Sequence, residues 1–370
     1  MILHISCDDQ FVRYVDKQFM EGNTSSRLVV CDYNVAPEFA KHAPHMEYIQ
    51  AYSDDFRQLL QSLCSYTGII FHGLFGRWAT DILDAVPNDV KIGWVCWDAE
   101  VFARPEREFD NLMPITRMLR RLKYAYSYLK NGNKSHPDYF VPKDRFKRIN
   151  YCLCDMPQEA IESNRYFGTQ MEWLPYNYYT IEETVGDLHD ARVKGNNIFL
   201  GNACRYGNNH IDALWQLKGL IGKSQKVITP LSYGNMGLQK HVLRAGQLLL
   251  GDAFEPLVDY MPLEEYNAKM LSCSVMIQNH YTPQALGNIL VGLWLGMRVY
   301  LSKRNVTYDF LKDLGVHVYT VEDDLNRKNP YLFEPLIDIE VAHNREALEN
   351  FYGEKATKEK VELIIQKMIK

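Results

Sequence analysis

Residues 278–290 read QNHYTPQALGNIL, and residues 292–301 read GLWLGMRVYL. This stretch predicts a buried strand at 275–278, a polar loop, a helix starting near Pro283 and a second strand at 298–301. Gln284, Gly287 and Asn288 would then lie at the start of the helix. Unpaired backbone amides and the positive end of the helix dipole meet there, which suits an anionic phosphate group. The alternative is an ordinary strand–loop–helix unit with a polar cap.

The bulk composition indicates a soluble globular protein of two domains. The chain has 370 residues, 46% of them hydrophobic and 24% charged, and this length exceeds one comfortable hydrophobic core. A net charge of -5 argues against a nucleic-acid-binding protein. The eight cysteines are scattered, so we expect reduced thiols in a cytoplasm and no structural metal site. No signal peptide or membrane-spanning stretch is apparent, and no cofactor is expected.

The first half of the sequence alternates strands with helices. Strands are predicted at 2–6, 28–33, 68–71 and 90–96, which indicates an α/β fold with a parallel, doubly wound sheet. Ligands of such sheets bind beyond the carboxyl ends of the strands. His72-Gly73 and Trp97-Asp98 follow two of these strands, so we expect them to line one crevice.

The strand–helix alternation stops at 172–196, which is typical of a linker, and then restarts. Further strands are predicted at 197–200, 226–230, 247–250, 275–277 and 299–301. We therefore expect two Rossmann-like domains facing a central cleft, at 1–180 and 196–345. The remaining segment, 346–370, ends in an amphipathic helix that could pack back on the first domain.

Polar loops follow the predicted strands of the second half. Gly201 ends a strand, where a glycine lets the backbone approach a ligand closely, and Asn202 comes next. Asn208 or Asn209 would cap the following helix. A Gly/Asn turn is the simpler interpretation, but polar loops follow other strands of this half as well, and Tyr233 and Gly234 belong to one of them.

The first half offers two residues for acid–base chemistry, His72 and Asp98. A histidine titrates near neutral pH, and a carboxylate can accept a hydroxyl proton or orient a histidine. Glu100 is a weaker third candidate. Asp9 follows the first strand and could contact an acceptor, although a helix cap is the simpler role.

Residues 114–130 combine apolar and basic residues. Ile115, Met118, Leu119, Leu122, Tyr126 and Leu129 follow helical spacing, and Arg117, Arg120, Arg121 and Lys123 occupy other positions. Such a helix can lie on an anionic membrane surface. The alternative is a helix packed on the core with a solvated basic face.

Several short blocks in order make the chain resemble a known enzyme family. They include Phe71 to Phe75, Trp94 to Asp98, Leu200 to Asn202, Val227 to Gly234 and Gln284 to Val299. The chain is similar to the TDP-N-acetylfucosamine:lipid II N-acetylfucosaminyltransferases, glycosyltransferase family 56, also called 4-alpha-L-fucosyltransferases. The first turn, Ser6 to Asp9, lacks the glycine expected of that family, and the loop 281–283 also differs.

The resemblance implies a GT-B fold, a nucleoside diphosphate sugar donor and an acceptor on a polyprenyl diphosphate lipid. It also implies which residues line each side. By the resemblance, the acceptor side would comprise His72, Trp97 and Asp98, and we also expect Gly73 and Asp9 there. The donor side would comprise Gly201, Asn202, Tyr233, Gln284, Gly287 and Asn288, and we also expect Gly234 there.

The sequence thus favours a metal-independent, inverting glycosyltransferase of surface polysaccharide synthesis, with Asp98 or His72 as the base. It would lie on the inner face of the cytoplasmic membrane through its basic helix and would not bind nucleic acid. Two alternatives remain open, a GT-B-like sugar-nucleotide epimerase and a non-catalytic nucleotide-sugar-binding protein.

Overall fold

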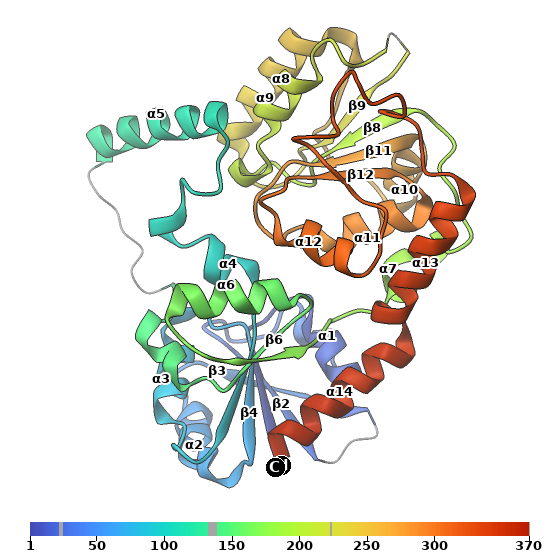
Figure 1. Cartoon of the computed structure of the whole chain (residues 1–370). Helices are drawn as coiled ribbons and strands as arrows, with labels where there is room; N and C mark the ends of the chain where they lie inside the picture. The colour runs from blue at the N-terminus through green and yellow to red at the C-terminus, as the bar shows by residue number, and fades with distance from the viewer. Residues whose placement is uncertain (22–24, 132–138, 223, 370) are drawn as a thin grey trace. The chain divides into compact units, whose positions relative to one another are not determined.

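The computed structural model describes residues 1–21, 25–131, 139–222 and 224–369. The chain divides into two compact units (Figure 1). Unit 1 comprises Met1–Arg104, Ser135–Thr180 and Tyr352–Lys370, and unit 2 comprises Pro105–Lys134 and Ile181–Phe351. The segment that begins at Pro105 therefore belongs with the second unit, although the sequence-based division assigned it to the first.

Unit 1 contains a seven-stranded sheet of order β3-β2-β1-β4-β5-β6-β7. Every neighbouring pair is parallel. The strands are β1 (Ile2–Ser6), β2 (Ser26–Asp32), β3 (Met46–Gln50), β4 (Gly68–His72), β5 (Lys91–Val95), β6 (Tyr151–Cys154) and β7 (Glu172–Pro175). The strand order reverses between β1 and β4, and such a switch point is where doubly wound sheets bind ligands.

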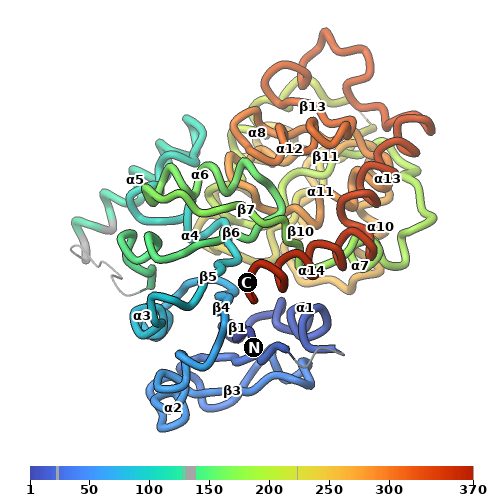
Figure 2. Tube along the Cα trace, turned by 60° about the horizontal axis from the view of Figure 1, so that its bottom comes forward, coloured from blue at the N-terminus to red at the C-terminus, as the bar shows by residue number. Residues whose placement is uncertain are grey.

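The helices of unit 1 cover both faces of this sheet. They are α1 (Val12–Val15, continued by a π turn to Met20), α2 (Asp54–Ser62), α3 (Gly76–Ala85), α4 (Asp98–Phe102), α6 (Pro157–Phe167) and α14 (Glu354–Ile369). The last helix packs on β1, β4, β5 and β7. Gly68 makes room for it, because a Cβ there would lie 2.7 Å from Cε of Met368. The two ends of the chain consequently lie near each other (Figure 2).

Unit 2 contains a six-stranded sheet of order β10-β9-β8-β11-β12-β13, again entirely parallel. Its strands are β8 (Asn197–Leu200), β9 (Val227–Pro230), β10 (Phe254–Leu257), β11 (Cys273–Gln278), β12 (Arg298–Leu301) and β13 (Tyr319–Thr320). The helices are α5 (Pro114–Asn131), α7 (Ile181–Val185), α8 (His210–Leu217), α9 (Met236–Leu250), α10 (Leu263–Leu271), α11 (Leu286–Leu295), α12 (Val306–Asp313) and α13 (Asp338–Tyr352). The order reverses between β8 and β11.

Some elements differ from the sequence-based expectation. The strand predicted at 247–250 is wrong, because these residues form the last turn of α9 and the strand β10 follows it. A short apolar run fits a buried helix as well as a strand. The segment expected to be a linker contains β7, an edge strand that ends at Pro175. Proline is tolerated there because an edge strand has a side without a hydrogen-bonded neighbour.

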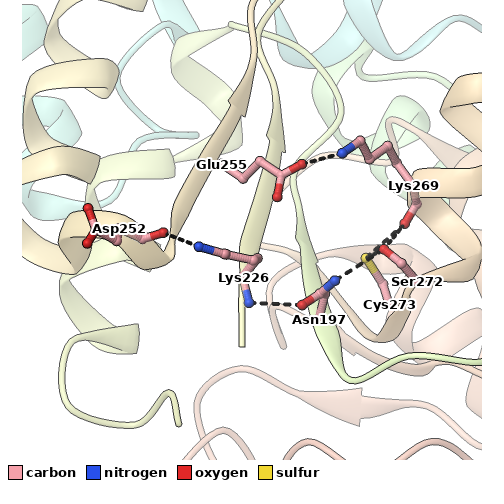
Figure 3. A network of polar contacts seen from close by, with 7 residues as sticks. All are labelled: Asn197, Lys226, Asp252, Glu255, Lys269, Ser272 and Cys273. Atoms are coloured by element: carbon pink, nitrogen blue, oxygen red, sulfur yellow. Dashed lines mark hydrogen bonds and ion pairs between the residues drawn. The ribbon is translucent and has the colours of Figure 1, made fainter. Parts of the chain in front are cut away.

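A polar network joins the amino ends of the unit 2 strands (Figure 3). It comprises Asn197, Lys226, Asp252, Glu255, Lys269, Ser272 and Cys273. The Asn197 side chain accepts from the Lys226 amide at 2.9 Å and donates to Ser272 Oγ at 3.2 Å. These contacts join β8 to the starts of its neighbours β9 and β11. The polar groups at this edge are thus used within the chain.

The start of α5 is anchored to α8 by two side chains. Asp212 accepts hydrogen bonds from the backbone amide of Thr116 at 2.9 Å and from its hydroxyl at 2.6 Å. Asn209 accepts from the Met113 amide at 2.8 Å. Amides at the start of a helix need such acceptors. These bonds explain why the segment belongs with unit 2.

Replacing Asp212 by alanine should therefore loosen α5. The change leaves buried donors without an acceptor, which costs about 2–3 kcal/mol of unfolding free energy. We expect a lower urea midpoint and faster protease cleavage within residues 105–131. The exposed carboxylate Asp309 on α12 provides the control Asp309→Ala. Equal midpoints and cleavage rates for the two variants would contradict this anchoring role.

Candidate functional site

The carboxyl ends of β8, β9 and β11 and the loops that follow them form what we call the unit 2 loop edge. At its centre, the Gly201 amide donates to the Ile277 carbonyl at 2.9 Å. The Gln278 side chain donates to the Gly201 carbonyl at 3.2 Å. Gly201 has φ +71°, and a Cβ there would lie 2.5 Å from Nε2 of His210. Only glycine fits this junction, which lies at the switch point of the sheet.

The loops after β8 and β9 are joined through their backbones. The Cys204 amide donates to the Tyr233 carbonyl at 2.9 Å, and the Asn235 amide donates to the Cys204 carbonyl at 2.7 Å. Gly234 has φ +113°, and a Cβ there would lie 2.4 Å from the Cys204 oxygen. The Tyr233 side chain is 52% exposed. The predicted residues Tyr233 and Gly234 therefore belong to the same edge as Gly201.

The helix α11 begins at Leu286, later than the sequence suggested. Ala285 precedes it in the left-handed region, with φ +60°. Gln284 lies close to the loop after β8, because its Nε2 is 3.4 Å from where a Gly207 Cβ would lie. Gly287 and Asn288 lie in the first turn and are half-buried. Asn288 donates to the Tyr266 hydroxyl at 3.2 Å, so its side chain already has one partner.

Buried polar atoms without a hydrogen-bond partner within the described protein concentrate at this edge. They are Asn202 Oδ1, Asn208 Nδ2, both ring nitrogens of His210, Gln278 Oε1, Asn279 Oδ1 and His280 Nε2. A buried polar group without a partner costs about 1–3 kcal/mol. Such groups are rare in native proteins and mark functional sites or ordered solvent. This concentration contrasts with the paired groups at the opposite edge.

Burial keeps the two histidines of the unit 2 loop edge neutral. It lowers the pKa of His210 to about 4, with a further contribution from His280. Burial also lowers the pKa of His280 to about 4. The second ring is held in place, since His280 Nδ1 lies 2.8 Å from the Thr282 carbonyl oxygen and 2.9 Å from Asn305 Nδ2.

The expectation that an asparagine side chain caps α8 is wrong. Asn209 occupies the N-cap position with φ +50°, but its side chain makes no capping bond to the helix. Its Oδ1 accepts from Met113, and its Nδ2 donates to the carbonyls of Asn111, Gly207 and Asn279. The side chain joins the loop edge to the segment before α5, a use that the sequence spacing does not reveal.

Two of the basic residues expected at a membrane instead approach the unit 2 loop edge. The Arg120 guanidinium carbon lies 4.9 Å from the Tyr206 ring centroid, and Lys123 Nζ lies 5.7 Å from it. Lys123 Nζ is also 2.8 Å from where a Gly237 Cβ would lie, in the first turn of α9. Arg120 forms an ion pair with Glu108 as well. The helix thus brings positive charge to the start of α9.

The opposite face of α5 is apolar and exposed. Met118 is 60% exposed, Leu122 64% and Leu129 84%. Arg121 is exposed too, while Leu119 packs against the unit 2 core. The sequence placed Leu119 with the other apolar residues on one face, whereas the structure separates them. Within the described parts of the chain, no helix is both long and apolar enough to cross a bilayer.

The corresponding edge of unit 1, the unit 1 loop edge, comprises the segments that follow β1, β4 and β5. His72 ends β4, and only 1% of it is exposed. Its Nε2 lies 3.1 Å from Nδ1 of the equally buried His4. Burial, reinforced by His4, lowers the pKa of His72 well below its usual value. This placement removes the argument for His72 as a base, because the ring is neutral and shielded from solvent.

Aromatic rings surround the strand ends of unit 1. The Trp97 indole donates to the Tyr178 hydroxyl at 3.0 Å. The Trp97 ring packs edge-on against Phe11 at 5.4 Å and Phe75 at 5.6 Å between centroids. Gly73, with φ +82°, passes so close that a Cβ would lie 3.2 Å from the Phe75 ring. Partly exposed aromatic faces of this kind suit a sugar ring.

The carboxylates of the unit 1 loop edge differ in their surroundings. Glu100 is fully buried and accepts from the Leu74 amide at 2.6 Å, the Trp94 indole at 2.9 Å and the Trp97 amide at 2.9 Å. These bonds indicate a structural role. Asp98 opens α4 and is half-buried, and its charge contributes to raising the pKa of the buried Glu159.

Asp8 and Asp9 follow β1 and have separate roles. Asp8 accepts from the backbone amides of Glu38, Phe39 and Ala40 and so holds the loop after β2. Asp9 accepts from the Phe11 amide at the start of α1. Asp9 is half-buried, and burial raises its pKa to about 6. No group of three or more His, Cys, Asp or Glu side chains suited to a metal ion occurs among the described residues.

Comparison with known proteins decides the family. The model of the 4-alpha-L-fucosyltransferases, glycosyl transferase group 56, matches residues 65–331. The chain belongs to this family. Family 56 membership confirms the resemblance drawn from the sequence, and the chain is a glycosyltransferase.

Solved structures similar to this family 56 chain share its GT-B fold. Sucrose-phosphate synthase from Thermosynechococcus elongatus matches with a TM-score of 0.64 and 11% identity, over 99% of this chain and 98% of that one. Anabaena HepE in complex with UDP and glucose matches with a TM-score of 0.58 and 11% identity, over 99% and 100%. The galactosyltransferase WaaB matches with a TM-score of 0.62 and 10% identity, over 99% of both chains. The expected fold of two Rossmann-like domains is confirmed.

The buried histidines predict an acid-sensitive stability. Since the pKa of His210 falls from 6.5 to about 4 on folding, the unfolded state binds a proton below pH 6.5 and the folded state does not. Stability is therefore full above pH 6.5 and declines below it, by about 2 kcal/mol at pH 5 for this residue. In His210→Gln, the urea midpoint should fall less between pH 8 and pH 5.

The matched control is His241→Gln, which alters an exposed histidine on α9. Urea titrations at both pH values measure the two changes. If His210→Gln kept the full acid sensitivity of the native chain, the buried neutral imidazole would not be its source.

Proposed function

We propose that this glycosyltransferase transfers a fucosyl-type sugar from a nucleoside diphosphate to a polyprenyl-diphosphate-linked saccharide of a surface polysaccharide. The observation that carries the proposal is the convergence at the unit 2 loop edge. Gly201, Gln284 and the cations of α5 approach the same loops there, among buried polar atoms that lack partners. In this scheme the donor binds to unit 2 and the acceptor to unit 1.

The donor diphosphate would bind without a resident metal ion. Backbone amides at the starts of α9 and α11 offer donors and the positive end of a helix dipole. Lys123 adds positive charge beside α9, and so does Arg120, which stacks on Tyr206. Gly201, Asn202 and Gln284 would line the rest of the donor site, and Tyr233 would offer an aromatic face to the donor. Gly234, Gly287 and Asn288 complete the proposed donor set.

The solved complexes of HepE with UDP and with UDP-glucose support a nucleotide sugar as the donor class.

The acceptor sugar would bind at the aromatic wall of the unit 1 loop edge. Trp97, with Phe11 and Phe75 beside it, offers ring faces, and Gly73 leaves room for the Phe75 and Trp97 rings. Asp98 would bind an acceptor hydroxyl from the start of α4. The reaction in this scheme is a single displacement with inversion at the anomeric carbon.

The lipid part of the acceptor would be reached through α5. Its exposed Met118, Leu122 and Leu129 form an apolar stripe, and Arg121 lies beside it. Amphipathic helices with basic flanks bind the interface of anionic membranes. We infer a peripheral enzyme on the inner face of the cytoplasmic membrane, where polyprenyl-linked saccharides and nucleotide sugars meet.

Removing the Lys123 charge should weaken nucleotide binding. We expect Lys123→Ala to raise the dissociation constant of TDP or UDP, whichever binds more tightly, by about tenfold, since a charge-assisted contact to phosphate is lost. Calorimetric titration with each nucleotide measures this. Lys240→Ala, which removes an exposed lysine on α9, is the control. An unchanged affinity in Lys123→Ala would exclude the lysine from the donor site.

Transfer assays separate the proposal from its alternatives. A panel including TDP-N-acetylfucosamine and UDP-sugars is incubated with polyprenyl-diphosphate-linked saccharides, and labelled lipid is measured. Labelled lipid supports the proposed reaction. Epimerised donor sugar without any acceptor would indicate an epimerase, and nucleotide binding without turnover would indicate a binding protein.

A charge on the apolar face of α5 should reduce membrane binding. We expect Leu122→Glu to lower the fraction bound to phosphatidylglycerol-containing vesicles by about tenfold, because the lost apolar contact and the added negative charge both oppose docking. Vesicle flotation measures the bound fraction. Leu248→Glu changes a leucine that is 81% exposed on α9 and serves as the control. Equal binding of both variants would argue against α5 as the docking element.

A further inference from the structure

We propose that Asp9 is the general base that accepts the proton of the acceptor hydroxyl. This inference rests on the proposed function and names a catalytic residue for it. Sequence spacing suggested Asp98 or His72 for this role and suggested a contact or a helix cap for Asp9. The topology of unit 1, the bonds of Asp9 and the surroundings of the other acids point to Asp9 instead.

The position of Asp9 follows from the strand order of unit 1. The residue comes three positions after β1, whose neighbours are β2 and β4. The order reverses between β1 and β4, and a switch point of this kind is where doubly wound sheets bind ligands. Asp9 therefore lies at the switch point, together with Gly73 after β4. Asp98 follows β5, one strand further from that point.

The hydrogen bonds of Asp9 orient its carboxylate and leave it room for a further partner. Oδ1 accepts from the Phe11 amide, and Oδ2 lies 3.3 Å from Ser6 Oγ and 3.4 Å from Cys7 Sγ. An ionised carboxylate offers about four acceptor positions. Three are used by these neighbours, and the fourth can accept an acceptor hydroxyl.

Three other ionisable groups of this edge, Asp8, Glu100 and His72, are held by contacts within the protein. Asp8 accepts from three backbone amides of the loop after β2. Glu100 is fully buried and accepts three bonds, and His72 is fully buried beside His4. Asp9 alone among these four combines partial exposure with weak side-chain donors, a hydroxyl and a thiol.

The surroundings of Asp9 also suit a base that works near neutral pH. Burial and, to a smaller extent, the charge of Asp8 raise the pKa of Asp9, its hydrogen bonds lower it, and the resulting pKa is about 6. The charges of Asp9 or Cys7 in turn raise the pKa values of Tyr176, Tyr178 and Tyr139, and the charge of Glu100 raises that of Cys7. The pKa values of Cys7, Tyr176 and Tyr178 are raised well above their usual values, and that of Glu100 is raised to about 8. Among the groups with shifted pKa values named here, Asp9 is the one whose pKa lies near 6.

The proposed step balances without a further reactant. The acceptor oxygen attacks the anomeric carbon of the donor sugar and forms the new glycosidic bond. The bond from that carbon to the diphosphate oxygen breaks, and its electron pair leaves with the diphosphate. The proton of the acceptor hydroxyl passes to the Asp9 carboxylate, which later releases it to solvent.

The test measures transfer and its pH dependence in Asp9→Asn, with TDP-N-acetylfucosamine as the donor probe and a polyprenyl-diphosphate-linked saccharide as the acceptor. We expect kcat to fall by about 10²–10⁴-fold, the usual contribution of a general base. In the native chain, kcat/KM should fall tenfold per pH unit below about pH 6. This acid limb should vanish in Asp9→Asn, while the calorimetric affinity for TDP stays unchanged.

Three further variants guard against a merely structural effect. Asp9→Glu retains a carboxylate and should recover part of the rate together with an acid limb. Asp8→Asn alters the neighbouring structural carboxylate and should keep the limb near pH 6, as should Asp98→Asn. A native rate in Asp9→Asn, or loss of the limb in Asp98→Asn alone, would overturn the role of Asp9. Absence of transfer by the native chain would overturn the proposed function and this role with it.

Discussion

Parallel strand pairing at β1–β4 and at β8–β11 is the constraint on which the rest of the structure depends. At each pair the strand order of a sheet reverses, and such a switch point is where doubly wound sheets bind ligands. Gly201 and Gln278 meet at one of these points, and Asp9 and Gly73 follow the strands of the other. The sites that we propose for this family 56 glycosyltransferase thus lie at the two switch points of its sheets.

The helix α5 gives unit 2 a feature that its own sheet does not provide. Its start is held by Asp212 and Asn209 of the α8 region, so its orientation is set by buried hydrogen bonds. One face then brings Arg120 and Lys123 to Tyr206 of the unit 2 loop edge, and the other presents Met118 and its apolar neighbours to solvent. The donor-binding and membrane-binding roles that we propose for α5 therefore fall on two different faces of one helix.

Burial decides which ionisable groups can take part in the chemistry. His72, His210 and His280 lie in surroundings that disfavour their charged forms, and their pKa values fall below neutrality. The same effect acts on carboxylates in the opposite direction, raising the pKa of Asp9 to about 6 and that of Glu100 to about 8. Partial burial leaves Asp9 ionised near neutral pH, whereas full burial and three internal bonds make Glu100 part of the framework.

The sequence by itself determined the α/β class, the two Rossmann-like domains and the family, because strand–helix alternation and short motif blocks are local patterns. It also identified the loops around Gly201, Tyr233 and Gln284, since polar residues after buried strands can be recognised without coordinates. Only the tertiary structure decided that Asn209 holds the segment before α5 and that Arg120 and Lys123 approach the loops of unit 2. It alone showed that His72 is shielded from solvent. These properties depend on which distant segments pack together, and burial and side-chain partners follow from packing rather than from spacing along the chain.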